Sequence, residues 1–129
     1  MEKKYDLKLR TKQFAHRCIK LSLALPKNLL GLHLSKQLIR SSTSVAANYR
    51  AAFIAQSRKS FHSKISIVLE ECDESYFWIE FIADAKLITQ KLVDGLLKEA
   101  DELTRIFAAT RKKNQSIILF LIQYYLLLY

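Results

Sequence analysis

The stretch Arg40-Ser-Ser-Thr-Ser-Val-Ala-Ala-Asn48-Tyr-Arg-Ala-Ala52, followed by Leu69-Glu-Glu-Cys-Asp-Glu-Ser-Tyr-Phe-Trp78, establishes the fold class of this 129-residue chain. Spacings of four and three residues in the first part place one stripe on a helix: Leu34, Leu38, Ser41, Val45, Asn48 and Ala52. We expect Ser41 and Asn48 to hydrogen-bond inside a helical bundle, because an unpaired buried polar group is costly. A ligand site at these residues is the alternative.

The second part predicts a helix with apolar residues on two sides. Its core stripe consists of Phe61, Ile65, Leu69, Cys72, Tyr76, Ile79 and Ala83. Ile67, Phe77 and Phe81 lie on the other side, beside Glu70 and Glu74. Because one core cannot bury both sides, we predict that these five residues form an oligomer interface. Coverage by the chain's own terminal segment is the alternative.

Two glycines and one proline predict a few long helices and not a sheet. Pro26, Asn28 and Gly31 mark the first break, and Ser57 and Thr89 are candidate N-caps. The predicted helices cover residues 8–25, 33–55, 58–85 and 90–112. Short connections favour antiparallel neighbours, so we expect an all-α fold, an antiparallel up-down-up-down four-helix bundle. The outer helices supply core residues at two sets of positions: Leu7, Phe14, Cys18, Leu21 and Leu25 in the first, and Leu92, Leu96, Leu103 and Phe107 in the fourth.

We divide the chain into a bundle over residues 1–115 and an apolar C-terminal tail over residues 116–129. The tail has no charged side chain, but it is shorter than the roughly 20 residues with which a helix spans a bilayer. Packing onto the bundle or a neighbouring subunit is the favoured reading. A poorly ordered tail and shallow membrane contact, aided by the cations at 111–113, are the alternatives. We do not expect membrane contact.

Charge is distributed unevenly along the chain. Residues 1–69 hold 14 Lys/Arg and two Asp/Glu, whereas residues 70–102 hold three and ten. Basic side chains outside the core stripes, Arg10 and Arg40 among them, are available to a polyanion. An excess of Lys and Arg usually forms only a solvated surface, but these side chains also displace counterions from phosphates. We predict nucleic-acid binding without base readout, through five residues: Arg17, Lys20, Arg50, Arg58 and Lys59.

The sequence predicts no catalytic residue, no cofactor and no metal site. The three histidines are scattered, and the carboxylates of residues 70–74 have no histidine support from other helices. Cys18 and Cys72 fall on apolar stripes, so we expect buried, reduced thiols. Residues 1–6 do not resemble a secretory signal, and we expect a cytoplasmic protein.

Four segments in this order together carry a family resemblance: Phe14 through Leu25-Pro26, Leu38-x-Arg40-Ser-Ser-x-Ser44-Val-Ala-Ala-Asn48, Arg58-Lys-Ser-Phe61 and Leu69-Glu-Glu-x-x-Glu74-Ser-x-x-Trp78. The chain resembles, over residues 8–112, the four-helix-bundle family encoded in intervening sequences of 23S ribosomal RNA genes. The resemblance extends to the accessory variability proteins of diversity-generating retroelements. It implies a bacterial, cytoplasmic, non-enzymatic protein that assembles as a ring-like homopentamer. The retroelement relatives bind nucleic acid and a reverse transcriptase through basic surfaces.

The chain departs from the family pattern in two places. Tyr49-Arg50-Ala51-Ala52 stands where many members have an acidic residue and a glycine, and the second departure is the tail. We predict a nucleic-acid-binding accessory protein, a basic oligomeric ring that binds RNA or DNA. It would support a reverse transcriptase or associate with ribosomal RNA. The alternative is a structural adaptor that binds a protein partner without nucleic acid.

Overall fold

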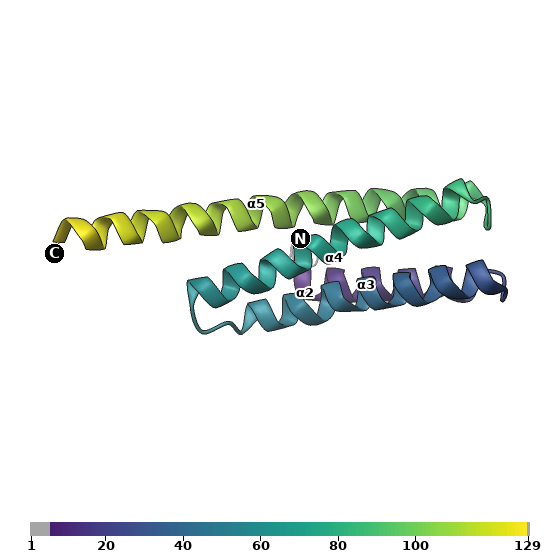
Figure 1. Cartoon of the computed structure of the whole chain (residues 1–129), viewed down its shortest axis with the longest axis horizontal. Coiled ribbons are helices and arrows are strands. Elements are labelled where there is room, and N and C mark those ends of the chain that lie inside the picture. The colour runs from purple at the N-terminus through teal and green to yellow at the C-terminus, as the bar shows by residue number, and fades with distance from the viewer. Residues whose placement is uncertain (1–5, 129) are drawn as a thin grey trace.

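Four α-helices account for almost all of residues 6–128, which are the residues that the computed structural model describes. Successive helices run in opposite directions and pack side by side, and α2 also touches α5, so the four close into one bundle (Figure 1). The prediction of an all-α, antiparallel up-down-up-down four-helix bundle is confirmed. The bounds of the helices are α2 (Leu7–Leu23), α3 (Leu29–Phe53), α4 (Arg58–Asp84) and α5 (Gln90–Leu128).

Polar side chains cap the first three helices. The Ser57 hydroxyl accepts a hydrogen bond of 3.0 Å from the amide three residues later, as predicted, and Asp6 caps α2 in the same way. α3 starts before the predicted position 33, because the Asn28 side chain accepts from the Gly31 amide at 2.9 Å. Gly31 thus lies in the first turn of α3, where a Cβ would clash with the Pro26 carbonyl oxygen.

One stripe from each helix forms the core. The predicted stripe of α3 is buried at every position except Asn48, which is half-buried. On α5 the prediction of Leu92 in the core is wrong, because Leu92 is 61% exposed and its neighbour Val93 is buried instead. α4 packs against both α3 and α5, so it buries a wider face than one stripe. This face includes Val68 and Ile82, which the sequence analysis did not assign to the core.

Two buried hydroxyl groups connect α3 to α4. Ser75 Oγ donates to Ser41 Oγ at 2.9 Å, and both side chains are fully buried. Ser41 therefore finds its predicted partner inside the bundle, where a cross-helix bond fixes the register of the two helices. Asn48 instead bonds within its own helix, from Nδ2 to the Ser44 carbonyl oxygen at 3.0 Å.

The last helix continues beyond the bundle. α5 was predicted to end near residue 112, but it runs to Leu128, since neither glycine nor proline interrupts it after Gly95. Asn114 is its last buried residue, and residues 119–128 are all exposed, so the expected packing onto the chain's own bundle is not seen there. We call residues 115–128 the α5 extension. It projects past the α3–α4 connection (Figure 1). Within residues 6–128, no helix has both the length and the apolar content required to cross a membrane.

Candidate nucleic-acid interface

The five cations predicted to bind nucleic acid are all exposed, but they form two groups. Arg50 lies in the last turn of α3, and Arg58 and Lys59 lie in the first turn of α4, just after a short connection. Arg17 and Lys20 are on α2, and they lie beside the α4–α5 connection, at the other end of the bundle. The structure therefore brings three of the five together and leaves two apart.

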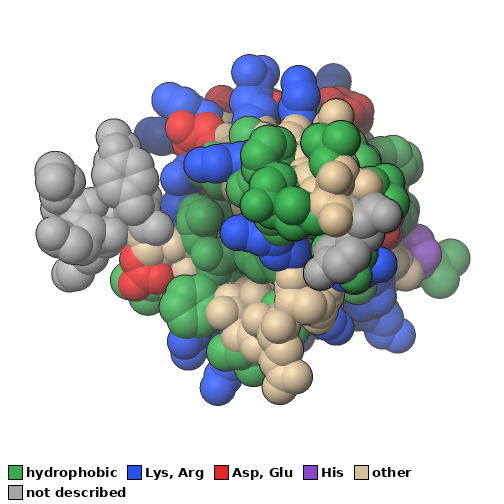
Figure 2. Space-filling view, turned by 90° about the vertical axis from the view of Figure 1, so that its left-hand side faces the viewer, with side chains coloured by type: hydrophobic (Ala, Val, Ile, Leu, Met, Phe, Trp, Pro, Cys, Tyr) green, Lys and Arg blue, Asp and Glu red, His purple; other side chains and the backbone are tan. Residues whose placement is uncertain are grey.

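Further cations gather around the first group. Asn114 of α5 donates to the Arg58 carbonyl oxygen at 3.1 Å, which holds α5 against the start of α4. The segments that meet here, residues 45–69 and 103–128, contain no Asp or Glu. Figure 2 views this end of the molecule and shows Lys and Arg around its rim, with a few carboxylates, and apolar side chains in front. We define the basic end as Arg50, Arg58, Lys59, Lys64, Arg111, Lys112 and Lys113.

Arg10 is not available to a polyanion, contrary to the sequence analysis. Its guanidinium donates to both carboxylate oxygens of Glu99 on α5, at 2.9 and 2.6 Å, and to Glu102 at 3.3 Å. The hydrogen bonding of Arg10 to Glu99 is the main reason why the pKa of Arg10 is raised above its usual value. The pair ties α2 to α5.

Arg40 is also paired, on the other side of the bundle. It donates to Glu71 at 2.9 Å and binds Glu74, so it joins α3 to α4 and is not free for phosphates. Glu74 accepts in addition from Trp78 Nε1 at 3.2 Å. Of the two carboxylates assigned to an oligomer interface, Glu74 is thus bound within the chain, whereas Glu70 is exposed.

The apolar members of that predicted interface form an open surface on α4. Ile67, Phe77 and Phe81 are 37%, 49% and 43% exposed. Trp78 lies edge-on to Phe77 with ring centroids 4.9 Å apart, and to His33 of α3 at 5.8 Å. We call these five residues the aromatic face. Because the α5 extension projects from the opposite end of α4, no terminal segment within residues 6–128 covers this face (Figure 1).

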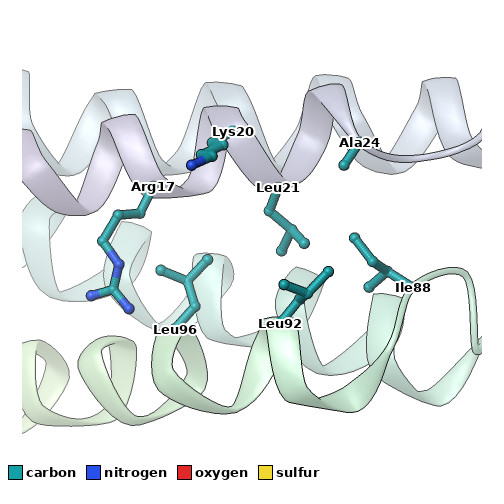
Figure 3. A pocket seen from close by; sticks show the side chains of 7 residues that line it. All are labelled: Arg17, Lys20, Leu21, Ala24, Ile88, Leu92 and Leu96. Carbon is teal, nitrogen blue, oxygen red and sulfur yellow. The ribbon is translucent and has the colours of Figure 1, made fainter.

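A pocket of about 320 Å³ lies between α2 and α5 (Figure 3). Apolar side chains form its walls, and Arg17 and Lys20 stand beside them. Arg17 reaches α5, where its Nη2 lies 3.4 Å from the place that a Cβ on Gly95 would take. The pocket could not be predicted from the sequence, because its walls combine helices that are far apart in the chain. The apolar wall residues are Leu21, Ala24, Ile88, Leu92 and Leu96.

The two cysteines are buried and free, as predicted. Burial raises the pKa of Cys18 to about 12 and raises that of Cys72 as well, since a thiolate loses its hydration in the core. Both are therefore protonated thiols at neutral pH and poor nucleophiles. Across residues 6–128, no three His, Cys, Asp or Glu side chains are grouped as metal ligands would be.

Comparison with known proteins gives a family match and similar solved structures. Residues 3–109 match the sequence profile of the family described as 23S rRNA-intervening sequence protein. A crystal structure of a Bacteroides thetaiotaomicron protein, of unknown function and from the S23 ribosomal protein family, is 31% identical with a TM-score of 0.75. The alignment covers 81% of this chain and 97% of that one. No curated protein matches the chain. The α5 extension lies outside the family match.

Proposed function

The chain belongs to the 23S rRNA-intervening sequence protein family, and we propose that it is a non-enzymatic accessory protein that binds nucleic acid. The observation that carries this proposal is the basic end, built from segments that contain no Asp or Glu. Cations placed on phosphates release condensed counterions, which favours binding whatever the base sequence. The partner is therefore RNA or DNA, and the proposal includes no base readout, because phosphate contacts carry no sequence information.

The proposal includes assembly into a ring-like homo-oligomer, the pentamer that the family resemblance implies. Support comes from the aromatic face, since exposed aromatic side chains that cluster on one surface are enriched at protein interfaces. A ring would present several basic ends to one polyanion, and the second contact would then form at a high effective concentration.

The biological setting follows from the nucleic acid that is bound. The family name favours ribosomal RNA, and the retroelement relatives suggest support of a reverse transcriptase. Both settings place the protein in the bacterial cytoplasm. Copurification with ribosomal RNA, or with a reverse transcriptase, from the native cell would separate them.

The aromatic face also favours a second candidate, a structural adaptor that binds a protein partner without nucleic acid. Aromatic side chains with a polar edge are typical of such contacts. The same face cannot serve both self-assembly and a separate partner at once. A stable oligomer that buries Phe77 would therefore count against the adaptor.

Salt-dependent binding tests the nucleic-acid proposal. Fluorescence anisotropy with a labelled single-stranded RNA and a labelled duplex DNA should give affinities that fall steeply with salt. We expect the logarithm of the association constant to fall linearly with the logarithm of the salt concentration, with a slope of about −0.7 to −0.9 per phosphate neutralised. The triple variant Arg50→Glu, Lys59→Glu, Lys64→Glu should lose binding at the lowest salt, because it reverses the charge of the basic end.

The matched control makes the same change of net charge elsewhere: Lys36→Glu, Lys91→Glu, Lys98→Glu. These three side chains are exposed and lie outside the basic end, so this variant should keep most of the affinity and the slope. A separate variant, Arg17→Glu with Lys20→Glu, measures whether the second group of cations contributes. Failure of the wild-type protein to bind either probe at low salt would reject the proposal.

Light scattering tests the assembly. Phe77→Asp should lower the mass, because the interface would have to desolvate a charge. Leu23→Asp is the control, since Leu23 is 72% exposed and lies on α2, which contributes no residue to the aromatic face. A wild-type protein that is monomeric at micromolar concentration would contradict the ring.

A further inference from the structure

The α5 extension is apolar on every side. Successive residues of an α-helix are about 100° apart, so the unbroken apolar run from Ile117 to Ile122 covers the full circumference of the helix, and Gln123 is the one amide between this run and residues 124–128. A helix of this kind is stable when apolar material surrounds it. The side chains concerned are between 46% and 80% exposed: Leu119, Phe120, Leu121, Ile122, Leu126, Leu127 and Leu128.

A single partner helix would not cover this surface. The core stripe of α5 does continue into the extension, at Ile117, Leu121, Tyr124 and Leu128. A second copy of the chain that packed along this stripe would still leave Phe120 and Leu126 in water, because they lie on other sides of the helix. Because the helix is apolar all round, an apolar environment that surrounds it would cover this surface better than one neighbouring helix would.

Cations surround the base of the extension. Arg111, Lys112 and Lys113 precede it directly, and α5 carries no Asp or Glu after Glu102. Arg58 and Lys59 line a hollow together with apolar side chains of the extension, so two helices contribute cations at this point. Figure 2 shows apolar side chains in front of the basic rim. Lys and Arg beside an apolar segment attract the anionic headgroups of a membrane surface.

The length of the extension matches one leaflet. Residues 117–128 form a helix about 18 Å long, at about 1.5 Å per residue. The hydrocarbon core of a bilayer is about 30 Å thick, so the helix would reach the middle of the membrane without crossing it. This agrees with the finding that no helix within residues 6–128 is fit to span a bilayer.

We propose that the α5 extension inserts into one leaflet of an anionic lipid membrane, with the basic end against the lipid headgroups. Shallow membrane contact, aided by the cations at 111–113, was one of the alternatives that the sequence left open, and packing onto the bundle or a neighbouring subunit was the favoured one. The proposed insertion does not require nucleic-acid binding, although it uses the same basic end, and it rests on a segment outside the family match. Lipid phosphates and nucleic acid would compete for the same cations.

Vesicle flotation tests the insertion with the full chain. The wild-type protein should float with vesicles of phosphatidylcholine and phosphatidylglycerol, and much less with phosphatidylcholine alone. The variant Leu126→Glu, Leu127→Glu should partition roughly a hundredfold more weakly, because each charge must enter the hydrocarbon. The control Leu23→Glu, Leu29→Glu makes the same change at exposed leucines of the opposite end and should float like the wild type.

The cations are tested separately. Lys112→Gln with Lys113→Gln should weaken binding to the anionic vesicles roughly tenfold, because each Lys near an anionic surface contributes to attraction. Lys91→Gln with Lys98→Gln, on the bundled part of the same helix, is the matched control. Nucleic-acid binding by the Leu126→Glu, Leu127→Glu variant should be unchanged, which keeps this test distinct from that of the proposed function.

Three outcomes would overturn the insertion. The first is a wild-type protein that does not float with anionic vesicles. The second is equal flotation of wild type and the Leu126→Glu, Leu127→Glu variant, since the basic surface alone would then account for binding. The third is a lower mass of that variant than of the wild type by light scattering in the absence of lipid. A second copy of the chain would then cover the extension.

Discussion

The more apolar part of α5 is the exposed part. Within the bundle, residues 90–114 contain both charged and apolar side chains, and the stripe from Val93 to Phe107 is buried. Beyond it, residues 119–128 are almost entirely apolar and all exposed. The reason is what lies beside the helix: α5 packs against α4, which begins at Arg58, and against α2, which begins at Leu7, and it runs on past the α3–α4 connection (Figure 1). Burial along one helix is thus set by its surroundings as well as by its own residues.

The largest difference between the two parts should come from the same leucine-to-alanine substitution made in each of them. Leu103→Ala should lower the free energy of unfolding by about 2 to 5 kcal/mol, because Leu103 is fully buried and a cavity would remain. Leu126→Ala should change it by less than about 0.5 kcal/mol, since that side chain is exposed. Urea unfolding followed by circular dichroism measures both. Equal losses would mean that the extension belongs to the core.

Asn114 marks the boundary between the two parts, and its loss should cost about 1 to 3 kcal/mol. Asn114→Ala removes the donor to the Arg58 carbonyl oxygen at 3.1 Å, at a site that is 5% exposed. Gln115→Ala, at the next and exposed position, is the control and should be close to neutral. The same unfolding measurement applies. A neutral Asn114→Ala would show that α5 needs no polar tie to the start of α4.

Charge pairs on the bundled part should have smaller effects that depend on burial. Glu99→Gln should cost about 1 to 2 kcal/mol, because it weakens charge-assisted hydrogen bonds to Arg10 at a site where the Glu99 side chain is 15% exposed. Asp101→Asn should cost at most about 0.5 kcal/mol, since its pair with Arg105 is exposed. Unfolding at low and high salt checks both, and only the Asp101 effect should vanish in salt. The reverse pattern would contradict the assignment of the Arg10 pair as a tie between α2 and α5.

Removal of the exposed part should have the smallest effect on the bundle. A chain that ends at Ile118 should keep the unfolding free energy of the full chain within about 0.5 kcal/mol, because residues 119–128 bury little against the bundle. It should also be more soluble, since an exposed apolar surface is lost. Differential scanning calorimetry and a solubility assay measure the two effects. A fall in the melting temperature beyond that range would refute the separation of the two parts.

Local pattern was enough to predict the helices, since the period of an α-helix is visible in neighbouring residues. It located the stripe of α3, the Ser57 cap and the buried thiols. It also found that the five proposed nucleic-acid contacts are exposed, because they lie outside every stripe. It failed at Leu92, where two adjacent apolar residues competed for one core position and the packing of α5 selected Val93.

The residues alone therefore established the fold class, the core stripes and the excess of positive charge, which are properties of segments. The packing of the helices against one another settled which charges are satisfied. Arg10 and Arg40 are bound by carboxylates of other helices, whereas Arg58 and Lys59 lie beside apolar side chains of α5. Packing also left the α5 extension outside the bundle. These outcomes depend on which distant segments become neighbours, and the energy of a charge or an apolar side chain is set by those neighbours.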